Sequence, residues 1–143
     1  MAAERTAQVT WSGSLLDGSG TIDRVGSGAF GPLDVTWASR TEESNGRTSP
    51  EELIAAAHAS CFSMAFSGAL AKAGTPPERL ETSATVTFVP GEGITKSALT
   101  VRGSVPGMDD AAFREAADSA KENCPVSKAL AGVPEITIDA SLS

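Results

Sequence analysis

The stretch from Ser49 to Gly74, SPEELIAAAHASCFSMAFSGALAKAG, limits the fold more than any other part of the chain. Ser49 suits a helix N-cap, Pro50 suits the first helical position, and Glu52 completes a capping box, so we predict that a helix begins here. From Leu53 to Leu70 no residue carries a formal charge, and the large apolar side chains point in several directions around the helix. A helix of this kind must be buried on nearly all sides.

The same uncharged run is long enough to be considered as a membrane span. It contains His58 and several serines, however, and it is rich in Ala where a membrane span is rich in Leu. We therefore interpret it as the core helix of a soluble domain and expect no membrane partner. A single sheet leaves part of such a helix bare, so we expect a partner surface, most simply a second copy of the chain, to cover it.

Length and charge favour one soluble domain spanning residues 1–143, with 41% hydrophobic residues and a net charge of -7. The negative charge argues against nucleic acid and against an anionic membrane surface as partners. The opening residues, MAAERTAQVTW, contain no apolar segment of the secretory type, which predicts a cytoplasmic protein. In that reducing compartment the two cysteines should be thiols, and only a transient disulfide is expected.

Alternating polar and apolar residues predict strands at 7–12, 21–25 and 33–37 before the helix, and at 80–88, 94–105 and 136–140 after it. The segment 39–48 is expected to be a polar connection that turns at Asn45-Gly46. Asp109 or Asp110 is expected to open an amphipathic helix that ends near Asn123. The predicted element order is βββ-α-ββ-α-β, an α+β fold with antiparallel sheet around a long central helix.

Cys124 opens the segment CPVSKAL. Pro125 suits the first position of a short helix, which would make Cys124 its cap, where free backbone N–H groups and the helix dipole favour a thiolate. A redox role and a purely structural role are equally compatible with this segment alone.

Cys61 lies in the middle of the uncharged helix, where a cysteine usually acts as a small hydrophobic residue. The charged residues near the start of the helix favour a functional role for Cys61. Arg40 and Arg47 precede the helix, and Glu51 lies in its first turn. An arginine that reached Cys61 would lower the pKa of the thiol and hold a departing oxygen anion. Glu51 lies roughly 15 Å from Cys61 along a straight helix, so it must act through Arg40 or at the site of a neighbouring chain.

His58 is the only histidine, and it lies three residues before Cys61. It can be a general base for the thiol, a zinc ligand together with Cys61 and Cys124, or a hydrogen-bonded residue of the core. The glycine-rich segment 18–31 lacks a lysine and does not lead into a helix, so no nucleotide cofactor is expected.

Residues 49–67 and CPVSKAL at 124–130 together resemble the two signature segments of the osmotically inducible protein C / organic hydroperoxide resistance (OsmC/Ohr) family of thiol peroxidases. The form AAHASCFSMA resembles the OsmC branch more than the Ohr branch. The similarity in length and element order covers nearly the whole chain. It implies an intertwined homodimer whose sheets wrap around central helices, with active sites at the subunit interface.

The resemblance also implies roles for individual residues. Cys61 matches the peroxidatic cysteine and Cys124 the resolving cysteine; Arg40 best matches the active-site arginine, with Arg47 as second choice, and Glu51 matches its acidic partner. The implied reaction reduces organic hydroperoxides, and hydrogen peroxide less well, through a sulfenic acid and a disulfide that an external dithiol reduces. It uses no cofactor and no metal.

Two other functions stay open from the residues alone. One is a zinc-dependent hydrolase or lyase that uses His58, Cys61 and Cys124. The other is a noncatalytic module that binds a small molecule, with both cysteines structural. Neither of them accounts for both signature segments.

Overall fold

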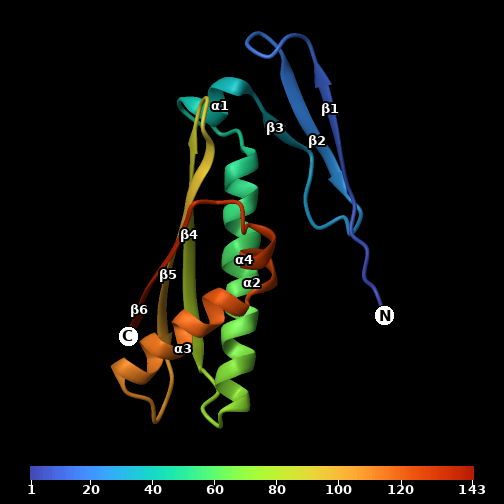
Figure 1. Cartoon of the computed structure of the whole chain (residues 1–143). Coiled ribbons are helices and arrows are strands. Elements are labelled where there is room, and N and C mark those ends of the chain that lie inside the picture. Colours follow the sequence, from blue (N-terminus) through green and yellow to red (C-terminus); the bar gives the residue numbers. More distant parts are fainter. The chain divides into compact units, whose positions relative to one another are not determined.

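The computed structural model describes residues 1–143, and the chain divides into two compact units, Met1–Pro50 and Glu51–Ser143. Figure 1 labels the helices and strands of both units. The sequence places three strands before the long helix and three after it, and this order is confirmed.

The first unit contains a three-stranded antiparallel sheet in the order β1-β2-β3. Its strands are β1 (Ala7–Ser12), β2 (Ser19–Val25) and β3 (Leu33–Val35). Ile22 is the buried apolar residue of this unit, whereas every residue of β1 is exposed. A sheet with so little buried apolar surface has almost no core of its own.

The end of the first unit differs from the sequence prediction. A strand was expected to continue to residue 37, and 39–48 was expected to be a connection without regular structure; instead a short helix, α1 (Trp37–Thr41), begins there. Thr36 Oγ1 accepts from the Ser39 N–H at 3.0 Å, and Ser39 Oγ accepts from the Thr36 N–H at 2.9 Å. This reciprocal cap overrides the short alternating pattern. The predicted Asn45-Gly46 turn is confirmed by their positive φ angles of 49° and 78°.

The second unit is built on α2 (Pro50–Lys72), which begins and ends where the sequence predicts. It packs against a three-stranded sheet of β4 (Arg79–Val89), β5 (Gly93–Ser104) and β6 (Glu135–Leu142). β4 and β5 form the predicted antiparallel hairpin with one polar face.

β6 departs from the expected antiparallel arrangement because it pairs parallel to β5. Two helices, α3 (Asp110–Asn123) and α4 (Pro125–Ala129), lie between these strands in the sequence. A connection of this length returns the chain to the end of the sheet from which β5 started, so the next strand runs in the same direction.

The core of the second unit lies between α2, α3 and one face of the sheet, and Figure 1 shows α3 crossing α2. Phe66 links the layers, with its ring centroid 5.5 Å from that of Phe62 and 5.1 Å from that of Phe113. Gly103 on β5 permits this packing, because a Cβ atom there would lie 2.8 Å from the Phe113 ring. The buried cluster consists of Phe62, Phe66, Leu70, Leu99, Val101, Val105, Phe113, Ala117, Ala120, Cys124 and Ala140.

Within one chain α2 is not buried on all sides, although its sequence is apolar all round. His58, Phe62, Phe66 and Leu70 recur every four residues and face the core. The opposite side is open, and the Met64 side chain there is 75% exposed. Although α2 has the length and composition of a membrane span, it is the core helix of this unit.

Candidate active site

The second unit brings the two cysteines together. Cys61 is half-buried on α2, and Cys124 is fully buried at the N-cap of α4. Both are free thiols, and they lie close enough for each to shift the pKa of the other. Although the two cysteines are 63 positions apart in the sequence, the fold places one sulfur close to the other.

Cys124 occupies the cap position that the sequence predicts, with Pro125 as the first residue of α4. Its side chain forms no capping hydrogen bond of standard geometry, but the Ser127 and Val126 amides and the Ser127 hydroxyl approach the sulfur. Burial opposes ionisation of this thiol, yet these donors, with the Cys61 thiol, hold its pKa below the ordinary value. Negative charge on this sulfur is therefore stabilised by the N-terminus of α4.

The pKa of Cys61 shifts in the opposite direction. Burial raises the pKa of its thiol, the Val126 amide acts against this, and the contact with Cys124 raises the pKa further. Within the second unit, negative charge is therefore stabilised better on Cys124 than on Cys61. A Cys61 thiolate, which the sequence interpretation requires, needs an added positive charge.

His58 is a hydrogen-bonded residue of the core. Its ring is fully buried, with Nδ1 2.7 Å from Ser97 Oγ on β5 and Nε2 2.8 Å from Ser127 Oγ on α4. Burial lowers the pKa of the imidazole, which favours the neutral form. Both ring nitrogens are engaged by hydroxyls, so neither is left to act on Cys61 as a base.

The zinc site that the sequence left open does not form. No group of three His, Cys, Asp or Glu side chains lies close enough to hold a metal ion. His58 turns both nitrogens to serines instead of joining Cys61 and Cys124. The sequence analysis did not predict that these two serines bind His58. Ser127 could have been considered because it lies three residues after Cys124 in the signature segment. Ser97 has no distinguishing feature in the sequence, and only its buried position on β5 marks it.

The charged residues of the predicted site belong to different units. Arg40 is half-buried on α1, with its guanidinium carbon 5.9 Å from the centroid of the Trp37 ring. Arg47 is exposed and follows the Asn45-Gly46 turn. Glu51 is buried in the first turn of α2, in the second unit. The pairing of Arg40 with Glu51 and the approach of an arginine to Cys61 therefore stay predictions.

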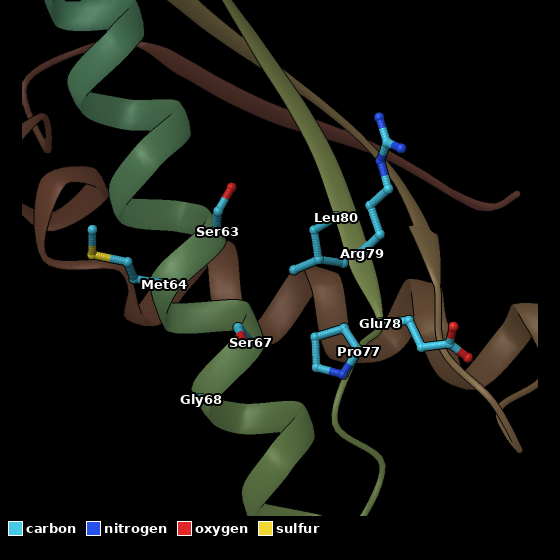
Figure 2. A pocket seen from close by; sticks show the side chains of 8 residues that line it. All are labelled: Ser63, Met64, Ser67, Gly68, Pro77, Glu78, Arg79 and Leu80. Carbon is cyan, nitrogen blue, oxygen red and sulfur yellow. The ribbon is translucent and has the colours of Figure 1, made fainter.

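A groove of about 580 Å³ runs along the open side of α2 beside the start of β4. Figure 2 shows Met64 extending from α2 away from β4. The groove contains neither cysteine, so it is a surface of the helix and not the thiol site. Its lining residues are Ser63, Met64, Ser67, Gly68, Pro77, Glu78, Arg79 and Leu80.

Comparison with known proteins gives a consistent result. Residues 43–139 match the family model described as OsmC-like protein. The chain is 40% identical to peroxiredoxin OsmC of Escherichia coli (strain K12), over 99% of both chains. It is 36% identical to an organic hydroperoxide resistance protein of Xanthomonas axonopodis pv. citri, over 64% of this chain and 65% of that one.

A solved structure supports the same fold. The crystal structure of an organic hydroperoxide resistance protein from Elizabethkingia anophelis superimposes with a TM-score of 0.70 at 21% identity, over 100% of both chains. At this identity the likeness concerns the fold alone. The α+β architecture with a long central helix is thus shared.

Proposed function

Since the chain belongs to the OsmC-like protein family, we propose that it is a cysteine-based peroxidase that reduces organic hydroperoxides to alcohols in oxidative and osmotic stress defence. The observation that carries this proposal is the contact between the Cys61 and Cys124 side chains. A thiol pair of this kind can cycle between the reduced state and a disulfide without a cofactor. An enzyme of this type is an oxidoreductase that takes its electrons from an external dithiol.

The proposed reaction begins at Cys61, which is the more accessible of the two sulfurs. Its thiolate attacks the terminal oxygen of the hydroperoxide, the O–O bond breaks, and the alkoxide takes up a proton and leaves as the alcohol. Cys61 is then a sulfenic acid. The Cys124 thiolate attacks the Cys61 sulfur, the S–O bond breaks, and the oxygen leaves as water once it is protonated.

The external dithiol closes the cycle by exchange with the Cys61–Cys124 disulfide. Apolar alkyl hydroperoxides suit the surroundings of Cys61 better than hydrogen peroxide does. Phe62 is buried in the core and is not available to a substrate, so this preference rests on the apolar character of the sequence around Cys61.

Arg40, held by Glu51, is proposed to keep Cys61 ionised and to stabilise the departing oxygen. Burial supports this choice over Arg47, because Arg40 is half-buried beside Trp37 and Arg47 is exposed. A guanidinium sheltered from water acts more strongly on a nearby thiolate than one that is surrounded by water.

An intertwined homodimer in the cytoplasm, with one domain per chain spanning residues 1–143, completes the proposal. The open side of α2 around Met64 and the exposed strand β1 offer apolar surface that a second copy would cover. The family match at 43–139 extends across the boundary between the two units, which supports a single domain.

The test is a thiol titration of the reduced protein before and after one equivalent of an organic hydroperoxide, combined with intact mass. The proposal expects loss of both thiols and a mass decrease of about two protons. Cys61→Ser should abolish turnover, whereas Cys124→Ser should consume one peroxide per site and retain a sulfenic acid. Thiols that stay inert to hydroperoxide would instead favour the noncatalytic binding module.

A further inference from the structure

Three buried side chains form a connected line that the proposed reaction does not use. Ser97 lies on β5, His58 on α2 and Ser127 on α4, and each is buried. The two hydrogen bonds that join them, through the two nitrogens of His58, are 2.7 and 2.8 Å long. Ser127 lies three residues after Cys124, the N-cap of α4, and its hydroxyl approaches the Cys124 sulfur closely enough to lower the pKa of that thiol.

Hydrogen-bond chemistry gives this line a direction. Ser127 has a single hydroxyl proton, and it stabilises the Cys124 thiolate only when it donates that proton to the sulfur. Its oxygen must then accept from His58, so Nε2 carries the imidazole proton. In the neutral ring Nδ1 is consequently an acceptor, and Ser97 donates to it. Each hydrogen bond in such a series polarises the next one.

We propose that Ser97 and His58 are positioning residues that orient the Ser127 hydroxyl toward Cys124. This line of hydrogen bonds makes Cys124 the leaving sulfur when the Cys61–Cys124 disulfide is reduced. The inference deepens the proposed function and rests on it. Ser127 contacts the reacting sulfur, whereas His58 and Ser97 act through Ser127.

A thiolate of the reductant attacks the sulfur of Cys61 and forms a mixed disulfide there. The Cys61–Cys124 bond breaks and its electron pair goes to the sulfur of Cys124, where the Val126 and Ser127 amides and the Ser127 hydroxyl receive the charge. Attack at Cys61 agrees with burial, because Cys124 is fully buried and Cys61 is not. A better stabilised thiolate leaves faster.

The first experiment measures the Cys124 pKa by thiolate absorbance in a Cys61→Ser background, which removes the second thiol. Adding Ser127→Ala should raise this pKa by about one unit, since a hydrogen bond to a charged group is lost. Ser127→Thr keeps the hydroxyl and should stay near the parent value. This rescue separates loss of the donor from general damage at the site.

Ser63→Ala is the matched control, because Ser63 also lies on α2 and its hydroxyl makes a tertiary hydrogen bond, to Thr82 Oγ1 at 2.7 Å. It should leave the Cys124 pKa unchanged. His58→Leu should raise that pKa in the same direction as Ser127→Ala, whereas His58→Gln, whose amide can donate in place of Nε2, should restore part of the difference. Equal values for Ser127→Ala and Ser63→Ala would overturn the proposal.

The second experiment determines directly in which direction the hydrogen bonds through His58 run. His58 is the only histidine, so long-range ¹H–¹⁵N spectra of the reduced protein report on this ring alone. We expect the neutral form with the proton on Nε2 at pH 7. A proton on Nδ1, or an imidazolium at that pH, contradicts the proposed direction of these hydrogen bonds.

The third experiment tests the leaving sulfur. The disulfide is formed with diamide, which needs no peroxidase activity, and is reduced with a monothiol under rapid quench. The mixed disulfide should be found on Cys61, and Ser127→Ala should slow its formation while Ser63→Ala should not. A mixed disulfide on Cys124 refutes the inference. Failure to consume hydroperoxide in a protein that passes these tests would instead refute the proposed function alone.

Discussion

Each unit of this protein contains a three-stranded sheet, but the two sheets differ in what covers them. In the second unit α2 and α3 bury one face of the sheet over an aromatic cluster centred on Phe66. In the first unit Ile22 is the buried apolar residue, and β1 is exposed along its whole length. Strand pairing alone therefore builds a sheet, whereas a core requires an apolar helix laid across it.

The chemistry follows the same division. The thiols of Cys61 and Cys124 and the His58 hydrogen bonds lie in the unit with the core, where packing fixes their geometry. Arg40, the proposed source of positive charge, lies in the unit without one. The second unit thus holds the thiol pair by itself, and the proposed ionisation of Cys61 depends on the first unit.

The largest expected effect comes from truncating the core of the second unit. Phe66→Ala should destabilise the protein by about 3–5 kcal/mol, because it removes a ring packed between Phe62 and Phe113. Leu16→Ala in the first unit should change stability by less than about 0.5 kcal/mol, since Leu16 is exposed. Urea unfolding measures both; a loss at Leu16 as large as that at Phe66 would mean that the first unit is covered in solution.

The next effect tests whether the first unit contributes to catalysis. Arg40→Ala should reduce kcat/KM for an organic hydroperoxide by about 10²–10³-fold, because a charge that stabilises the thiolate and the departing oxygen is removed. Arg47→Ala is the matched control, and it should have little effect. The reverse ranking would identify Arg47 as the active-site arginine, and two unaffected variants would confine the chemistry to the second unit.

Two strand glycines offer a smaller and more direct comparison. A Cβ at Gly103 would lie 2.8 Å from the ring of Phe113, and one at Gly20 would lie 2.6 Å from the ring of Trp11. Phe113 is buried in the core and cannot move freely, whereas Trp11 is 41% exposed and can. Gly103→Ala should therefore cost about 1–3 kcal/mol, and Gly20→Ala should cost less. Thermal unfolding of the two variants measures the difference.

The smallest effect is a pH dependence of stability at His58. Burial lowers the pKa of this imidazole in the folded state, so the unfolded chain binds a proton more readily. Stability from this group is complete above its ordinary pKa of 6.5 and is lost as the pH falls below it, by at most about 1.4 kcal/mol per pH unit. His58→Gln should remove this component of the difference between urea midpoints at pH 7 and pH 5; an unchanged difference would contradict it.

Local sequence signals predict the helices of the second unit well. α2 begins at the predicted Pro50, and Asp109 before α3 and Pro125 at the start of α4 both act within one turn of the chain. The same kind of signal was missed at Thr36, whose cap partner is Ser39 and not the usual Glu or Gln. The parallel pairing of β6 was missed because strand direction depends on where a crossover returns the chain and not on the strand's own residues.

Sequence by itself determined the six strands, the helices of the second unit, the apolar character of α2 and the two cysteines, because caps, alternation and composition act through neighbours along the chain. It also allowed His58 three roles and gave no partner for it. Only the tertiary structure decided that this histidine joins Ser97 to Ser127, and that the start of α4 lowers the pKa of Cys124 whereas burial raises the pKa of Cys61. A hydrogen bond and a pKa depend on distances between residues far apart in sequence, and those distances exist only once the core has formed.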